Sequence, residues 1–158
     1  MAADDDIDTG ELVRLTVHGV LPDQNTDTYI VILRDAQHAD VLPIWVGAAE
    51  GGAIKMALDG TVAARPMSHD LIRSFTEHLN IKVSQAVITD VKNNTYFAKV
   101  HLVTESGEHQ VDSRPSDAIA LALRTNCPIF VTQEVLRQRG GTNLDAWLER
   151  FGTKNLGK

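Results

Sequence analysis

The stretch VDSRPSDAIALALRTNCPIFV, residues 111–131, contains in order a strand end, a helix and a second strand. Pro115 is acceptable in a helix only in the first turn, where an N–H has no intrahelical acceptor, so we expect the helix to begin there. Residues 118–123 (AIALAL) are apolar on every side, which indicates a helix enclosed by other elements. Asn126 is a suitable C-terminal stop, and residues 129–131 then predict a short buried strand.

Charged residues suit both ends of this helix. Asp117 falls in the first turn, where a carboxylate faces the positive end of the helix dipole, and Arg124 falls near the negative end. The stretch therefore predicts a strand–helix–strand unit around the corner formed by residues 114–117.

The rest of the chain predicts more strands than helices. Tyr96 and Val100 share one face of a strand, and Asn93-Asn94 tolerates the positive φ that a tight hairpin needs. Leu71, Ile72, Phe75 and Leu79 form one apolar stripe at helical spacing, with Ser68 as the expected N-cap. The expected strands are 13–17, 29–33, 41–46, 81–91, 95–104 and 109–112, and the expected helices are 47–58, 68–79, 134–139 and 144–151.

These elements predict a single α+β domain with a mixed, largely antiparallel sheet and helices packed against it. We expect an acidic tail at residues 1–11, the domain at residues 12–136, and a short helix and tail at residues 137–158. Gly51 and Gly52, adjacent within the helix at 47–58, indicate close packing, a kink or a late helix start.

Composition excludes some classes of function and leaves others open. The formal charge is −6, but five of the 21 acidic residues lie between Asp4 and Glu11 with no basic residue among them, so the remainder is nearly neutral. Such a body neither supports nor excludes phosphate binding. Cys127 is the only cysteine, which excludes an intramolecular disulfide and favours a cytoplasmic location. No apolar run is long enough to cross a membrane.

One corner of the sequence occurs twice. Residues 65–70 (RPMSHD) repeat the pattern of residues 114–117 (RPSD), and each places an arginine, a proline, a serine and an aspartate before an apolar helix. Proline, serine and aspartate are what helix starts prefer, so these corners have a purely structural interpretation as well as a functional one.

Three ordered motifs, LPIWVGAAEGGAI at 42–54, RPMSHDLI at 65–72 and DSRPSDAIALALRTNCPIFV at 112–131, resemble the bifunctional nuclease domain of bacteria and plants. The resemblance covers roughly residues 12–136. It implies a compact α+β domain, often self-associating, to which degradation of DNA and RNA is ascribed. Gly51 departs from the alanine usual in that family, which leaves Glu50 in place on a softer helix.

The residues of the two corners could support phosphodiester chemistry. Metal-assisted hydrolysis needs carboxylates around a divalent ion such as Mg²⁺ or Mn²⁺, with cations to hold the phosphate. A histidine can also serve as general base without metal. The candidate catalytic residues are Glu50, His69, Asp70 and Asp117; the candidate metal ligands are Asp70, Asp117 and Asp112; and the candidate substrate-binding residues are Arg65, Arg114, Ser68 and Ser116.

Two functions of different class follow. The first is a nuclease acting on DNA and RNA with a divalent metal, with nucleic acid as its partner. The second is a non-enzymatic oligomeric binding or regulatory module whose arginine–aspartate corners are structural. Convergence of Glu50, Asp70 and Asp117 in one cleft would favour the enzyme, and separate ties to separate helices would favour the module. For both we expect a homodimer or higher homo-oligomer, because the family resemblance suggests it and the apolar strand at residues 41–46 needs cover.

Overall fold

The computed structural model describes residues 12–37 and 40–141. Its strands form one seven-stranded sheet in the order β3-β2-β1-β7-β4-β5-β6. The elements are β1 (Leu12–Asp23), β2 (Thr28–Asp35), β3 (Val41–Gly47), α2 (Ala48–Asp59), α3 (Ser68–His78), β4 (Lys82–Lys92), β5 (Thr95–Thr104), β6 (Gly107–Ser113), α4 (Pro115–Thr125), β7 (Ile129–Thr132) and α5 (Gln133–Arg139). The predicted tail at 1–11 and the predicted helix at 144–151 lie outside the described residues.

Strand β7 joins two antiparallel halves of the sheet. It pairs antiparallel with β1, through Leu15 opposite Ile129, and parallel with β4, through Ile88 opposite Val131. All other strand pairs are antiparallel. Because β7 follows α4 directly, the stretch at residues 111–131 connects the β4-β5-β6 half to the β1-β2-β3 half. The predicted α+β domain with a mixed, largely antiparallel sheet is confirmed.

The tight hairpin between β4 and β5 is also confirmed. Asn93 and Asn94 have φ values of 52° and 65° and lie between Lys92 and Thr95, which are directly paired. Asparagine accepts this left-handed conformation at low cost, so the turn fixes the register of the longest strand pair.

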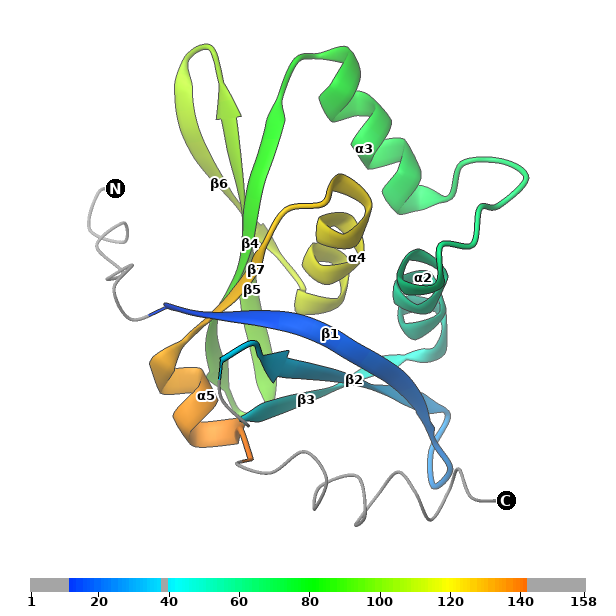
Figure 1. Ribbon diagram of the computed structural model, residues 1–158, viewed down its shortest axis with the longest axis vertical. Coiled ribbons are helices and arrows are strands. Elements are labelled where there is room, and N and C mark those ends of the chain that lie inside the picture. Colours follow the sequence, from blue (N-terminus) through cyan, green and yellow to red (C-terminus); the bar gives the residue numbers. More distant parts are fainter. Residues whose placement is uncertain (1–11, 38–39, 142–158) are drawn as a thin grey trace.

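Helix α4 lies against the sheet as its composition predicts. It begins at Pro115 and ends at Asn126, whose φ of 60° closes the helix in the left-handed conformation. Ile119 and Ala120 are completely buried, and Leu123 at its C-terminal end packs against the same core. Figure 1 shows α4 beside the vertical strands, with α2 and α3 on the same side and α5 apart from them.

Helix α2 owes its close approach to the sheet to a glycine. A Cβ atom on Gly51 would lie 2.7 Å from Cβ of Tyr29 on β2, whereas one on Gly52 would meet nothing within 4 Å. Of the alternatives raised for this glycine pair, close packing applies to Gly51. Gly60 ends the helix with a φ of 73°.

The expected N-cap of α3 needs correction. The N-cap of α3 is Met67, and Ser68 is the first helical residue; the carboxylate of Asp70, and no serine hydroxyl, accepts the hydrogen bond from the Met67 N–H at 2.9 Å. Within edge strand β3, Val41, Leu42 and Ile44 are buried in the protomer, whereas Trp45 is 47% exposed. The expected homo-oligomer stays a prediction.

The apolar stripe of α3 faces water. Phe75 is 60% exposed and Leu79 is 66% exposed, and the helix contacts the domain through its polar side. In Figure 1, α3 lies on the outer side of α4.

Candidate active site at the start of helix α4

Arg114 connects helices α2 and α4. It is the N-cap residue of α4, and its extended backbone, with φ −70° and ψ 148°, lets the side chain turn back over the first helical turn. Its Nε and Nη2 atoms donate to the two carboxylate oxygens of Asp117 at 2.9 and 3.2 Å. Its Nη1 atom donates to Oε2 of Glu50 at 3.1 Å. One guanidinium therefore holds a carboxylate from each of two helices.

Gly47 leaves space for this arrangement. The side chain of Glu50 lies over the backbone of Gly47, so that a Cβ atom at residue 47 would collide with Oε1 of Glu50. The glycine before α2 thus permits Glu50 to reach Arg114.

His69 on α3 completes the network. Its Nε2 atom lies 2.9 Å from Oδ1 of Asp117, and its side chain is only 12% exposed. Because an ionised carboxylate can only accept, Nε2 carries the proton in this pair, which leaves Nδ1 of a neutral imidazole with its lone pair. Three helices therefore contribute to one cluster, which we call the Arg114 network: Glu50, His69, Arg114 and Asp117.

The contacts favour the charged forms of Arg114 and Asp117. Burial alone would raise the pKa of Asp117, but hydrogen bonds from Arg114 and His69 outweigh it, and the net effect is a lowered pKa. Hydrogen bonds to Asp117 and then Glu50 raise the already high pKa of Arg114. The Arg114 side chain is 61% exposed, and its guanidinium carries five N–H groups, of which three are used by carboxylates among the described residues. No described residue uses the other two N–H groups, which could therefore bind a ligand.

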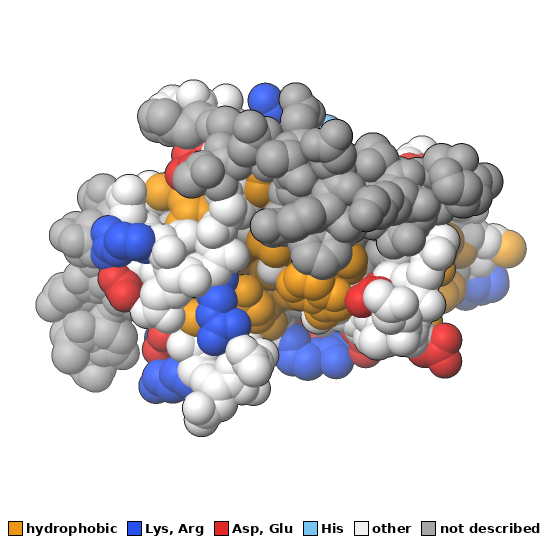
Figure 2. Space-filling model, turned by 90° about the horizontal axis from the view of Figure 1, so that it is seen from below, with side chains coloured by type: hydrophobic (Ala, Val, Ile, Leu, Met, Phe, Trp, Pro, Cys, Tyr) orange, Lys and Arg blue, Asp and Glu red, His pale blue; other side chains and the backbone are white. Residues whose placement is uncertain are grey.

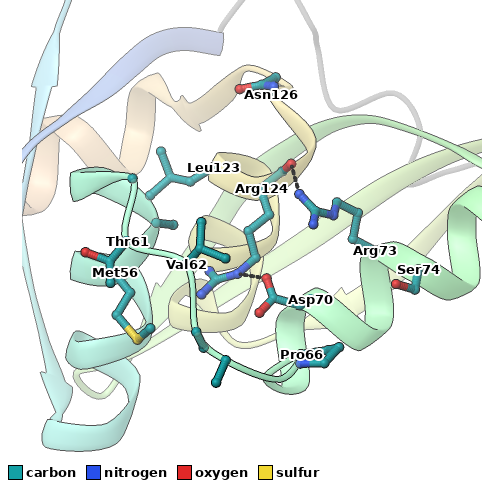
Figure 3. Close-up of a pocket in the computed structure, with 14 residues that line it drawn as sticks. Met56, Thr61, Val62, Pro66, Asp70, Arg73, Ser74, Leu123, Arg124 and Asn126 are labelled. Carbon is teal, nitrogen blue, oxygen red and sulfur yellow. Dashed lines mark hydrogen bonds and ion pairs between the residues drawn. The ribbon is translucent and has the colours of Figure 1, made fainter.

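Asp70 belongs to a different cluster. Its Oδ1 accepts from Nε of Arg124 at 2.9 Å, and Arg124, only 6% exposed, also donates to the carbonyls of Ala120 and Ala53. The hydrogen bond from the Met67 N–H, followed by the contact with Arg124, lowers the pKa of Asp70 although burial opposes it. Figure 3 shows this ion pair in a cavity of about 430 Å³, with Arg73 reaching the carbonyl of Arg124.

The structure thus separates the three carboxylates whose convergence was in question. Glu50 and Asp117 meet at Arg114, and Asp70 is held by Arg124. The importance of Arg124 was missed from the sequence, where it was interpreted only as a cation at a helix end. An arginine in the last turn of a helix that is apolar all round was the available signal, because such a residue must lie among buried elements.

The remaining candidates have varied surroundings. Arg65 and Ser68 are exposed, and among the described residues no hydrogen bond or ion pair of the Arg65 side chain is found. Ser116 is buried in the first turn of α4. Asp112 is exposed on β6, opposite Lys99 of β5. The two sequence corners are therefore alike in composition and different in structure.

The described residues offer no ready metal centre. Within 12–37 and 40–141, no group of three or more histidine, cysteine, aspartate or glutamate side chains is placed to hold a metal ion. Asp70, Asp112 and Asp117 have different neighbours and do not form one ligand set. The divalent metal stays a prediction.

The charge on the visible surface is mixed. In the described part of the face shown in Figure 2, Lys and Arg side chains are interspersed with apolar and acidic ones and form no continuous basic stripe. Among the described helices, none is long and apolar enough to cross a membrane.

Comparison of the sequence with known proteins finds a matching family. Residues 31–143 match the bifunctional nuclease domain. A protein of Mycobacterium tuberculosis described as uncharacterized is 35% identical over 124 residues, which are 78% of this chain and 74% of that protein.

Plant proteins are more distant relatives. Bifunctional nuclease 1 of Oryza sativa subsp. indica is 26% identical over 71% of this chain, and bifunctional nuclease 2 of Arabidopsis thaliana is 25% identical over 81% of it. The matched parts are 35% and 40% of those plant proteins. The match to the family domain extends over most of the sheet and includes all four residues of the Arg114 network, and the chain belongs to the bifunctional nuclease domain family.

Proposed function

We propose that this chain is a nuclease that hydrolyses phosphodiester bonds of DNA and RNA, and that the Arg114 network is its reaction centre. Membership of the family and the names of the plant relatives support the reaction class. The observation that carries the assignment of residues is the contact of one carboxylate, Asp117, with both a histidine and an exposed arginine.

Each member of the network has a distinct role in this proposal. Nδ1 of His69 accepts a proton from the attacking water, while Asp117 holds the ring and stabilises the imidazolium that forms. The water oxygen bonds to phosphorus and the ester P–O bond breaks. The leaving oxygen takes up a proton from solvent, and the His69 imidazolium releases its proton to solvent, which restores the base. The two unused N–H groups of Arg114 bind non-bridging phosphate oxygens, whose negative charge grows in the transition state. Glu50 fixes the orientation of the guanidinium.

A divalent metal, Mg²⁺ or Mn²⁺, is the second part of the proposal. Carboxylate oxygens suit these ions, and Asp117 is the predicted ligand that lies in the reaction centre. Because the predicted ligands do not form one set, the roles of His69 and of the metal require separate tests. A cytoplasmic location, where nucleic acid is present and Cys127 stays reduced, fits this function.

A non-enzymatic binding module is the second candidate. The observation in its favour is that Asp70 is held by a buried arginine and the Met67 N–H, which gives one of the two corners a structural role. In that case the Arg114 network would also only stabilise the contact between α2, α3 and α4.

Digestion of labelled single-stranded RNA and DNA by highly purified protein tests the proposal. The variant His69→Asn removes the proposed base, and Asp59→Asn is a matched control because, among the described residues, Asp59 pairs only with exposed Lys55 on α2. A positioned general base contributes about 10²- to 10⁴-fold, so we expect at least a hundredfold slower cleavage by His69→Asn and no change for Asp59→Asn. Parallel reactions with Mg²⁺, Mn²⁺ or a chelator test the metal. Equal rates for wild type and His69→Asn would point to a contaminating nuclease or another reaction centre.

A further inference from the structure

The cavity drawn in Figure 3, which we call the Arg73 cavity, lies between α2, α3 and α4. Its volume of about 430 Å³ falls within the range of about 300–1,000 Å³ that is usual for small-molecule sites. The segment that connects α2 to α3 lines one side of it through residues 60–64 and Pro66. Of two consecutive residues in the first turn of α3, His69 belongs to the Arg114 network and Asp70 lines the cavity. The cavity and the proposed reaction centre therefore lie on two sides of that turn.

The charged groups that line the Arg73 cavity leave one positive charge in excess. They are Arg73, Arg124 and, as the one acidic residue among the described residues of the lining, Asp70. Asp70 accepts from Arg124 through Oδ1 and from the Met67 N–H through Oδ2, so both of its oxygens are in use. Figure 3 shows the side chains of Arg73 and Arg124 reaching from α3 and α4 into the space between these helices. The cavity is thus suited to an anion.

Arg73 has N–H groups that the described residues do not use. Its Nη1 donates to the Arg124 carbonyl at 3.2 Å, whereas its Nε is buried without a hydrogen-bond partner. The carboxylate of Glu77, which is 68% exposed, lies 3.9 Å from Nε, too far for a hydrogen bond. A buried N–H without an acceptor costs free energy, and an anionic oxygen is a strong acceptor for a guanidinium. Arg73 therefore provides a place for a phosphate or carboxylate group.

The rest of the lining suits a body with apolar faces and polar edges. Met56, Val62 and Leu123 contribute apolar surface from α2, the connecting segment and α4. Ser74 and Asn126 add polar side chains, for which no hydrogen bond is found among the described residues. A nucleotide combines an anionic phosphate with a base that has two apolar faces and a hydrogen-bonding edge. Its chemistry matches each part of the lining.

We propose that the Arg73 cavity binds one nucleotide, with the phosphate on Arg73 and the base against Met56, Val62 and Leu123. A nucleic-acid strand and a free mononucleotide carry the same groups, so either can supply the ligand. For the strand, the inference rests on the proposed function: a strand held at the Arg114 network passes the first turn of α3, and a neighbouring nucleotide enters the cavity. The cavity then adds a base-binding subsite beside the reaction centre.

Calorimetric titration of the full-length protein with each of the four ribonucleoside 5′-monophosphates tests the site. We expect at least one of them to bind. The matching nucleoside and inorganic phosphate should bind about tenfold more weakly or less tightly still, because each lacks one of the two groups that the cavity recognises. Inorganic phosphate that binds as tightly as the nucleotide would overturn the proposal. So would the absence of binding by all four at millimolar concentration.

Variants at the mouth of the cavity locate the bound nucleotide. Val62 is 90% exposed, so its replacement should not disturb the fold. Because the phosphate is anionic, Val62→Glu should weaken binding several-fold and Val62→Lys should strengthen it, most clearly at low salt. The same two changes at Val111, which is 48% exposed on β6 and does not line the cavity, are the matched controls and should leave binding unchanged.

Replacing the proposed phosphate-binding residue is the second test of location. Arg73→Gln removes the charge, and we expect binding about tenfold weaker, with the melting profile showing that the variant is folded. If Val62→Glu and Arg73→Gln both bind the nucleotide as wild type does, the nucleotide lies elsewhere and the proposal is overturned.

Competition with cleavage distinguishes the two sources of the ligand. If the cavity holds part of the substrate strand, the bound mononucleotide should inhibit oligonucleotide cleavage, and Val62→Glu should weaken that inhibition. Binding without inhibition would keep the site and assign it to free mononucleotides. A protein that binds a nucleotide in the cavity and cleaves no oligonucleotide would contradict the proposed nuclease function alone, and one that cleaves but binds no mononucleotide would contradict the site alone.

Discussion

His69 and Asp117 lie 2.9 Å apart, although 48 residues separate them in the chain. The contact joins the first turn of α3 to the first turn of α4, and through Arg114 it reaches Glu50 on α2. Convergence of these four side chains follows from the way three helices pack on one side of a curved sheet.

Replacing Arg114 with lysine should reduce function and spare stability. Lysine keeps the charge but cannot make two parallel hydrogen bonds to Asp117 while holding Glu50. Because the side chain is 61% exposed, its ion pairs contribute about 0–1 kcal/mol, so we expect a melting temperature within a few degrees of wild type. Cleavage or nucleic-acid binding should fall about tenfold or more.

The matched control for this change is Arg137→Lys. Arg137 has a similar exposure and is paired with Glu134 on α5, away from the site. If Arg114→Lys instead melts far below wild type and cleaves normally once folded, Arg114 is a structural residue.

Replacing Asp70 with asparagine should reduce stability and spare cleavage. Arg124 would stay buried without its carboxylate, and breaking such a pair costs about 3–5 kcal/mol, so the free energy of unfolding should fall by roughly that amount. Cleavage per folded molecule should remain near the wild-type rate. Loss of cleavage with unchanged stability would instead place Asp70 in the reaction centre.

The pH dependence of this variant has a defined sign. The Met67 N–H and Arg124 lower the pKa of Asp70 below its ordinary value of 3.8. The ionised carboxylate therefore stabilises the fold above that value, and the contribution is lost as pH falls through the lower pKa of the folded state. The stability difference between wild type and Asp70→Asn, measured by urea unfolding, should be constant near neutrality and narrow below about pH 4.

Alanine substitutions at the two adjacent glycines of α2 should have opposite effects on stability. A Cβ atom at Gly51 would overlap Tyr29, and such overpacking costs about 1–3 kcal/mol. At Gly52 the space is free, so alanine should stabilise the helix by up to about 1 kcal/mol. Urea unfolding of both variants measures the difference, and equal effects would show that α2 does not depend on close approach to β2.

Local signals predicted much of the fold. Pro115, Asn126 and the Asn93-Asn94 turn act through backbone conformation at their own positions, so sequence was enough to place the α4 boundaries and the β4–β5 hairpin. The orientation of α3 could not be predicted in this way. Periodicity reveals an apolar stripe, but the side that faces the domain is decided by His69, Asp70 and Arg73 meeting α4, a contact between segments far apart in the chain.

The sequence was enough to name candidate residues for the site, but it could not show which of them contact one another. Both corners contain arginine, proline, serine and aspartate, yet only Arg114 has a glutamate from α2 within reach. Asp70 instead meets Arg124, and the partner of a carboxylate across two helices has no signature in local sequence.

The cleavage rate of Asp117→Asn under single-turnover conditions tests the central claim most directly, because Asp117 contacts both the proposed base and the proposed phosphate-binding residue. If the Arg114 network is the reaction centre, Asp117→Asn should cleave a defined oligonucleotide at least a hundredfold more slowly than wild type prepared in parallel, and adding His69→Asn should slow it little further, since the two residues act as a unit. Cleavage by folded Asp117→Asn at the wild-type rate would contradict the claim.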